Sequence, residues 1–176
     1  SCEAPDVDFA VQKAREAFED GRWSKMHPGA RKEVLIRLAK LMTRNARELA
    51  VLESLDAGKP ISVQINEEIP GVVDAIRFFA GAARTLQAPA GGDYLTGISS
   101  TMRREPLGVA AAITPWNYPL LQAVAKVAPA LATGNTVVLK PAEATPYSAA
   151  RLAELAAEIL ADLPAGDAVL YPEIAH

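Results

Sequence analysis

Two short polar segments, each directly after a run of apolar residues, carry the side chains best suited to chemistry. Residues 114–119 (TPWNYP) place Asn117 between two aromatic residues, where its amide could donate to a developing oxyanion or, alternatively, cap a following helix. Lys140 and Glu143 stand close together after the second run. An ammonium can donate to a hydroxyl oxygen while a carboxylate accepts a hydroxyl proton, so this pair could hold a sugar diol; a surface ion pair is the alternative.

Several common reaction types lack their residues in this sequence. It contains neither the G-x-G-x-x-G fingerprint of dinucleotide-binding proteins nor the G-x-x-x-x-G-K-[ST] phosphate loop. Its histidines are His27, which we expect at the surface, and His176, the final residue, so a Ser–His–Asp triad has no support. Cys2 is the single cysteine and has acids nearby, so we interpret it as inert. Metal-ligand spacing is absent, and we expect no metal site.

Composition narrows the class of protein to which these segments belong. The 176 residues are half apolar and 22% charged, which supports a packed core. The net charge of −3 argues against a general nucleic-acid binder, and no apolar run approaches the ~20 residues that a membrane helix needs. No basic segment followed by an apolar stretch opens the chain, so we expect a cytoplasmic protein without a secretory signal.

The first part of the sequence predicts helices followed by a strand. Apolar spacing predicts helices over residues 6–20 and 28–55, and a third helical stretch over residues 60–87 that Pro70-Gly71 should divide. Residues 98–104 are β-branched and polar, as in an exposed or edge strand. The second helix has a basic face that we expect to be solvated. This face comprises Arg31, Lys32, Arg37, Lys40, Arg44 and Arg47.

The remaining residues alternate strands and helices. Residues 109–114 and 135–140 are short apolar runs typical of buried strands, and we expect the first to be buried on both faces. Helices are predicted over residues 118–133 and 145–162, the second capped near Thr145. This order indicates a right-handed βαβ unit, and hence an α/β protein with a partial Rossmann-like parallel sheet and flanking helices. Ligands bind beyond the carboxyl ends of such strands, where both polar segments lie.

Longer motifs carry a resemblance to a known family. Four motifs are residues 105–109 (EPLGV), 113–119 (ITPWNYP), 128–131 (APAL) and 134–141 (GNTVVLKP). Their order and spacing closely resemble those of the NAD(P)-dependent aldehyde dehydrogenase superfamily. Residues 53–60 (ESLDAGKP) are similarly family-like. Residues 78–84 (FFAGAAR) and 102–108 (MRREPLG) look most like the aminoaldehyde branch, in particular γ-aminobutyraldehyde dehydrogenases, to which betaine-aldehyde dehydrogenases are close relatives.

The resemblance implies one mechanism. In this family a cysteine thiolate attacks the aldehyde carbon, and an asparagine side chain and the cysteine's own N–H stabilise the oxyanion. Hydride then passes to the nicotinamide. A water activated by a glutamate finally hydrolyses the thioester. The expected reaction is therefore NAD-dependent oxidation of a small aldehyde, in particular an aminoaldehyde, to its carboxylic acid. Glu68 or Asp74 could face an ammonium-bearing substrate, although a solvated helix face is the alternative for both.

Matching positions in the family's motifs imply roles for individual residues. Asn117 matches the oxyanion asparagine, Tyr118 matches an aromatic position of the aldehyde tunnel, and Lys126 matches a lysine near the active site. Lys140 and Glu143 match the pair that holds the adenosine ribose, and the carboxylate would repel a 2′-phosphate, which favours NAD over NADP. The stretch that matches the lining of the cofactor cleft consists of Ile113, Thr114, Pro115 and Trp116.

The resemblance also divides the chain. Residues 1–88 would form the helical part of the cofactor-binding domain, and residues 89–108 a linker with the strand of an oligomerisation arm near 93–105. Residues 109–176 would form an incomplete Rossmann-like NAD-binding part. We expect a homo-oligomer, a dimer or a tetramer, that is joined through the arm.

The sequence departs from the family's pattern in a few places. It opens just before the family's first long helix, and a strand-sized piece is missing between Gly166 and Asp167. It also stops before the catalytic domain with its cysteine and glutamate, and Cys2 lies on the wrong side of the cofactor domain to replace that cysteine. The residues could be joined stretches of a longer subunit, or a truncated relative that binds nucleotide or full-length subunits. In either case we expect the 176 residues alone to be inactive.

Overall fold

The computed structural model describes residues 3–88 and 91–161. The expectations for Cys2, His176 and the junction between Gly166 and Asp167 lie outside these residues. The first helix, α1 (Ala4–Glu19), confirms the helix predicted over residues 6–20.

The helix predicted over residues 28–55 is two helices, α2 (Pro28–Arg44) and α3 (Ala46–Ala57). Asn45 lies between them with φ −98° and ψ 16°, outside the helical region. Its side-chain Nδ2 and its backbone N–H both donate to the Leu41 carbonyl, at 2.9 and 3.1 Å, which ends α2. The apolar spacing continues across this point, so periodicity alone could not place the break.

The third helical stretch is continuous from residue 61 to residue 82. It consists of α4 (Ile61–Val63), the π-helical turn η1 (Gln64–Glu68) and α5 (Ile69–Ala82). The division predicted at Pro70-Gly71 is therefore wrong. The Ile69 N–H donates to the Gln64 carbonyl five residues earlier, and this wider turn directly before Pro70 lets the helix pass the proline.

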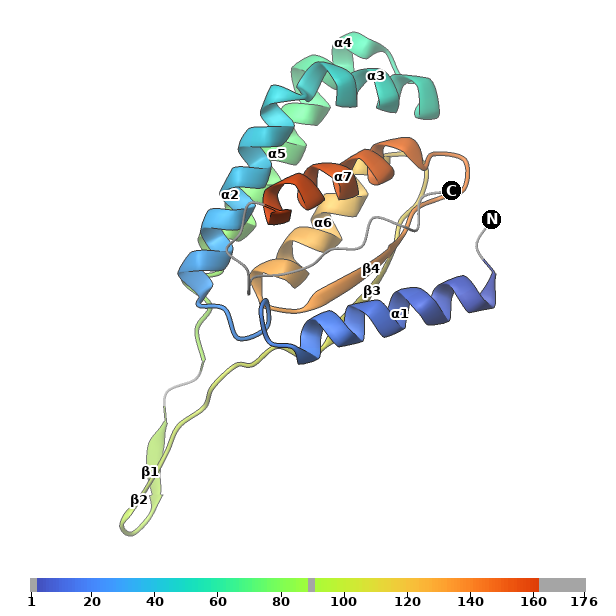
Figure 1. The fold of residues 1–176 in the computed structure, drawn as a ribbon. Helices are drawn as coiled ribbons and strands as arrows, with labels where there is room; N and C mark the ends of the chain where they lie inside the picture. The colour runs from blue at the N-terminus through green and yellow to red at the C-terminus, as the bar shows by residue number, and fades with distance from the viewer. Residues whose placement is uncertain (1–2, 89–90, 162–176) are drawn as a thin grey trace.

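A short antiparallel hairpin projects from the body of the molecule (Figure 1). Its strands are β1 (Gly92–Leu95) and β2 (Ile98–Ser100), and the turn between them contains Gly97 at φ 78°, a conformation that favours glycine. The strand predicted over residues 98–104 thus ends at residue 100. The residue pattern did not predict strand β1, because glycines at its start indicate a break rather than a strand, although β1 overlaps the stretch near 93–105 that the resemblance assigns to an arm strand.

The parallel pair of strands is present as predicted. Strand β3 (Val109–Ile113) pairs with β4 (Thr136–Lys140), and the intervening helix is α6 (Pro119–Ala132). Helix α7 (Tyr147–Ala161) follows β4. Helix α6 covers one face of the pair and α1 the other, as Figure 1 shows. Burial of β3 on both faces was wrong: Ala112 is its buried residue, whereas Ile113 at the carboxyl end is 72% exposed.

The main core lies between the helices rather than on the sheet. Helices α2, α5 and α7 pack around α6, and α3 closes one end of this group (Figure 1). The largest fully buried apolar side chains of this core are Leu35, Met42, Leu49, Ile69, Ile76, Leu120 and Leu155. Helix α6 is therefore packed on several sides, and the segment that precedes it is attached to a helix in the centre of the core.

Candidate functional site

The two polar segments leave the same edge of the parallel pair. Ile113 stands opposite Lys140 in the register, and the Thr114 N–H donates to the Lys140 carbonyl at 3.1 Å. Residues 114–118 and 141–146 then lead into α6 and α7 respectively. The expectation that these segments meet at the carboxyl ends of neighbouring strands is confirmed.

The segment before α6 presents its polar and aromatic side chains to solvent. Thr114 is buried, whereas Pro115, Trp116, Asn117 and Tyr118 are exposed. Tyr118, not Asn117, occupies the N-cap position of α6, and its side chain makes no capping hydrogen bond. Among the described residues Asn117 has no hydrogen-bond partner. The alternative that Asn117 serves as a helix cap is therefore not supported, and its amide is free to donate to a ligand.

The segment after β4 presents an unpaired cation and an unpaired carboxylate. Lys140 and Glu143 are both exposed, and within the described part of the chain no ion pair or hydrogen bond joins them. The alternative of a surface ion pair is therefore not supported. Both charges remain available to a ligand with hydroxyl groups.

The first turns of α6 and α7 are held from another helix. Glu53 on α3 is 1% exposed, and its Oε1 accepts the Leu120 N–H at 3.1 Å. Asp56, one turn further along α3, accepts the Tyr147 N–H with Oδ2 at 2.9 Å. The cap predicted near Thr145 is not a side-chain cap, because the Thr145 hydroxyl is buried without a hydrogen-bond partner.

The two α3 carboxylates that accept these N–H groups have raised pKa values. Burial is the main cause of the raised pKa of Glu53; the Ser148 hydroxyl, the Leu120 N–H and Lys59 act in the opposite direction. Burial also raises the pKa of Asp56, and its bond from Tyr147 opposes this. Glu53 and Asp56 were not predicted as site residues. Their spacing within residues 53–60 places both on one helix face, but nothing in the sequence says what that face contacts.

Tyr118 belongs to a charged cluster. Lys59 Nζ lies 3.3 Å from the centroid of the Tyr118 ring, as in a cation–π contact, and 2.8 Å from Glu68 Oε1. Gln64 Nε2 also donates to Glu68 at 3.3 Å. The negative charge of Glu68 is thus engaged by Lys59, whereas Asp74 is exposed on α5.

Lys126 lies on α6 and is half-buried. Its Nζ donates to the Gln122 side-chain Oε1 at 2.9 Å and to the Gln122 carbonyl at 3.4 Å. The described structure therefore holds this ammonium against its own helix, about two turns beyond the start of α6.

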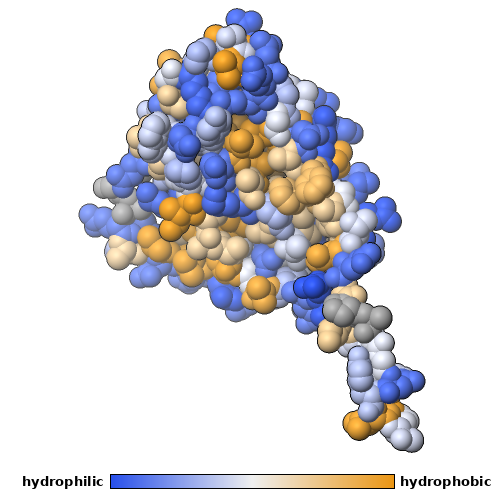
Figure 2. All heavy atoms as spheres, turned by 180° about the vertical axis from the view of Figure 1, so that it is seen from behind, coloured by the Kyte–Doolittle hydropathy of each residue, from blue (hydrophilic) through white to orange (hydrophobic). Residues whose placement is uncertain are grey.

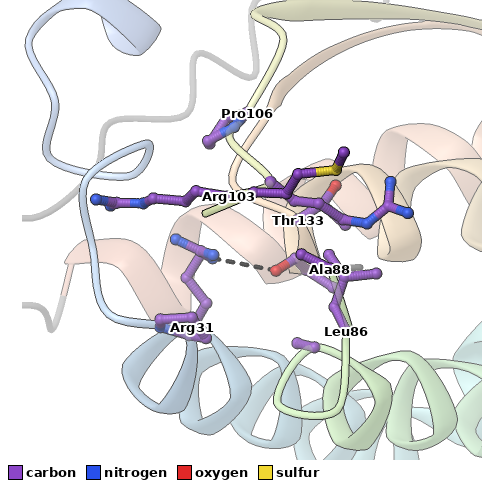
Figure 3. A pocket seen from close by; sticks show the side chains of 11 residues that line it. Arg31, Leu86, Ala88, Arg103, Pro106 and Thr133 are labelled. Carbon is purple, nitrogen blue, oxygen red and sulfur yellow. Dashed lines mark hydrogen bonds between the residues drawn. The ribbon is translucent and has the colours of Figure 1, made fainter. Parts of the chain in front are cut away.

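A separate hollow of about 290 Å³ lies between α2, the end of α6 and the segment after β2. Arg31 extends into it (Figure 3). Contrary to the expected solvated face, Arg31 is 7% exposed, and it donates to the carbonyls of Ala132 and Met26. None of the candidate site residues lines this hollow.

The described residues lack two further features, a metal-binding group and a membrane-crossing helix. They contain no group of three or more histidine, cysteine, aspartate or glutamate side chains that could hold a metal ion. Nor does any helix among them have the length and apolarity needed to cross a membrane.

The sequence was compared with known families and proteins. Residues 1–171 match the family model described as "Aldehyde dehydrogenase family". The NADP/NAD-dependent aldehyde dehydrogenase PuuC of Escherichia coli (strain K12) is 49% identical over 164 residues, which cover 92% of this chain and 32% of the relative. The aminoacetaldehyde dehydrogenase of Pseudomonas aeruginosa is 44% identical over 169 residues, covering 94% and 33%. The chain thus spans about a third of the length of these relatives.

Solved structures give the same result for the fold. The aldehyde dehydrogenase KauB from Pseudomonas aeruginosa superimposes with a TM-score of 0.88 at 43% identity, over 94% of this chain and 33% of that one. An indole-3-acetaldehyde dehydrogenase in complex with NAD⁺ superimposes with a TM-score of 0.87 at 46% identity, again over 94% and 33%. The α/β architecture predicted from the sequence is therefore confirmed.

Proposed function

Because the chain belongs to the aldehyde dehydrogenase family, we propose that its protein oxidises an aldehyde to the carboxylic acid with NAD, and that the residues described here bind the cofactor and stabilise the oxyanion. The observation that carries this proposal is the meeting of two segments with unused polar groups. In the part of the chain that the structure describes, the Asn117 amide has no partner and lies at the same sheet edge as Lys140 and Glu143, which are unpaired there.

Asn117 supplies the electrophilic assistance in this proposal. Its side-chain N–H₂ donates to the aldehyde oxygen as negative charge develops on it. A donor that is fixed before the reaction stabilises charge without reorganisation. The attachment of this segment at both ends supports this role, because Asn117 stands between the Thr114 bond to β4 and the buried start of α6.

Lys140 and Glu143 hold the ribose of the cofactor in this proposal. The ammonium donates to one ribose hydroxyl, and the carboxylate accepts from another. Both groups are exposed and without partners in the described structure, as a diol-binding pair requires. Bound NAD supplies a hydride acceptor. The carboxylate favours NAD over NADP, because it would face the 2′-phosphate of NADP.

The neighbouring residues shape the rest of the cleft. We place the cofactor against residues 113–116 and the aldehyde near Tyr118. Ile113 and Trp116 are 72% and 63% exposed at this edge, and such exposed apolar side chains suit a binding surface.

For the substrate we propose an aminoaldehyde. Support comes from the relatives, since the Pseudomonas aeruginosa protein is named as an aminoacetaldehyde dehydrogenase and a similar solved structure is a gamma-glutamyl-gamma-aminobutyraldehyde dehydrogenase. Glu68 is already paired with Lys59, whereas Asp74 is exposed. Of these two carboxylates, Asp74 is therefore the more available to a substrate ammonium.

For assembly we propose that the β1–β2 hairpin joins copies of the protein into a dimer or a tetramer. The hairpin projects from the body, and Tyr94, Leu95 and Ile98 on it are exposed. We further propose the division into a helical part (residues 1–88), an arm (89–108) and a cofactor-binding part (109–176).

Cofactor binding and turnover together test this function. The purified protein should bind NAD more tightly than NADP, and it should form NADH when an aminoaldehyde is added. A Glu143→Ala variant should lose most of the preference for NAD. Equal affinity of the unaltered protein for both nucleotides would contradict the role of Glu143, and NAD binding without aldehyde oxidation would indicate a non-catalytic relative.

A further inference from the structure

Helix α3 contacts the beginnings of both helices that follow the candidate site segments. The Glu53 carboxylate accepts the Leu120 N–H, in the first turn of α6, and the Asp56 carboxylate accepts the N–H of Tyr147, the first residue of α7. The two acids stand three positions apart, so they project from the same face of α3. We call Glu53 and Asp56 the α3 acid pair.

These two hydrogen bonds provide acceptors for N–H groups at the helix starts, which the helices themselves lack. The first N–H groups of a helix have no partner within it, and a nearby side-chain oxygen usually accepts one of them. Among residues 3–88 and 91–161, the N-cap side chain of α6 makes no such bond, and the Thr145 hydroxyl before α7 finds no partner. A carboxylate also interacts favourably with the positive end of the helix dipole. Each member of the pair therefore acts as a cap that is distant in sequence.

Each capped N–H is closely linked to a candidate site segment. Leu120 follows Pro119, and Asn117 lies three residues before it; Tyr147 follows Pro146, and Glu143 lies four residues before it. A proline fixes its own φ, so little backbone freedom remains between the bonded N–H and the segment before it. Displacing the start of either helix would displace the corresponding polar group.

From this arrangement, and resting on the function proposed above, we infer that Glu53 and Asp56 are positioning residues: Glu53 holds the Asn117 segment, and Asp56 holds the Lys140–Glu143 segment. Because one helix carries both acids, α3 fixes the oxyanion donor and the ribose-binding pair relative to each other. Neither acid contacts the reacting atoms in this scheme.

The first experiment needs no turnover. Amide hydrogen exchange is measured by NMR on the full-length protein. In Glu53→Ala the Leu120 amide should exchange faster while the Tyr147 amide is unchanged, and Asp56→Ala should show the reverse. The matched control is Glu48→Ala. Glu48 also joins α3 to α7, through Arg151 at 3.1 Å, but in the described part of the chain Glu53 and Asp56, and not Glu48, accept the Leu120 and Tyr147 N–H groups. Unchanged exchange at both amides in both alanine variants would overturn the inference.

The second experiment separates positioning from simple stabilisation. Because small misplacement of a reacting group is costly, Glu53→Ala should lower kcat by about tenfold or more with little change in the affinity for NAD. Asp56→Ala should instead weaken NAD binding by about fivefold with kcat nearly unchanged. Glu53→Gln and Asp56→Asn keep an oxygen that can accept the N–H, and they should recover most of each loss.

The possible outcomes are distinguishable. If exchange changes as expected but kcat and NAD affinity of the folded variants do not, the acid pair is structural and the inference is overturned. If the unaltered protein neither binds NAD nor oxidises aldehydes, the proposed function fails and takes the positioning role with it; the exchange data would then describe capping alone. If Glu53→Ala fails to fold, Glu53→Gln is measured in its place. Its kcat should stay close to that of the unaltered protein, and a loss of tenfold or more would overturn the role of the hydrogen bond.

Discussion

At the scale of single residues, the described structure separates side chains that are used internally from those left free. Asn117, Lys140 and Glu143 are exposed, and no hydrogen bond to another described residue holds their side chains. Glu53 is the opposite case, a buried carboxylate whose oxygen accepts a backbone N–H. Polar side chains that fold without internal partners at a sheet edge are the ones that a ligand can use.

The raised pKa of Glu53 gives a pH-dependent stability. A carboxyl group with a higher pKa in the folded than in the unfolded state binds more protons when folded, so its contribution to stability falls as the pH rises through this range. We therefore expect the free energy of unfolding of the unaltered protein, relative to Glu53→Gln, to decrease as the pH rises above the ordinary glutamate pKa of about 4.3. Chemical denaturation at several pH values measures this difference. A difference that grows with pH would contradict the burial of an ionisable Glu53.

At the scale of elements, hydrogen bonds between segments that are distant in sequence fix how helices and turns pack. The Arg31 side chain connects α2 to the last turn of α6 through the Ala132 carbonyl. Gly134, just beyond α6, has φ 88°, and a Cβ there would lie 2.8 Å from Pro106 and 3.2 Å from Arg31. The arginine therefore packs against a turn that only glycine fits.

Removing the Arg31 side chain should destabilise the protein. Arg31→Ala leaves the carbonyls of Ala132 and Met26 without this donor, and we expect a loss of about 2–4 kcal/mol in the free energy of unfolding. Lys40→Ala, on the exposed part of the same helix, should change the stability by less than about 0.5 kcal/mol. Denaturant unfolding compares the two variants. Equal effects would show that the buried bonds of Arg31 contribute nothing.

The elements also show how far the sequence could predict the fold. Apolar periodicity placed α1 and α6, and short apolar runs placed the parallel pair β3–β4, because burial determines both patterns. The break at Asn45, the π turn before Pro70 and strand β1 were missed, since each depends on a local hydrogen bond rather than on a repeat. Asn117, Lys140 and Glu143 could be proposed because they follow apolar strands, whereas the partners of Glu53 and Asp56 lie 67 and 91 positions away along the chain.

At the scale of the whole molecule, the hairpin carries exposed apolar side chains away from the body. Figure 2 shows apolar side chains across the middle of one face of the body, and the hairpin extends away from it. Exposed apolar groups on a narrow projection are poorly explained by folding of the body, because they contribute nothing to its core. They are explained if another copy covers them.

Two substitutions on the hairpin test its role in assembly. Leu95 and Ile98 are paired across β1 and β2 and are 65% and 55% exposed. The double variant Leu95→Ser, Ile98→Ser should reduce the mass of the assembly in solution, measured by light scattering, without lowering the unfolding temperature of the body. The same changes at Val7 and Val11, which are exposed on α1, provide the control. An unchanged mass in the hairpin variant would remove it from the interface.

The most direct test of the proposed site is Asn117→Ala. Removing one oxyanion donor should lower kcat by about 100- to 1,000-fold, or roughly 3 kcal/mol of transition-state stabilisation, while the Kd for NAD stays within about twofold. Asn66→Ala, at an exposed asparagine of η1, is the matched control and should leave both quantities unchanged. An Asn117→Ala protein that binds NAD and turns over like the unaltered one would contradict the oxyanion role on which the account depends.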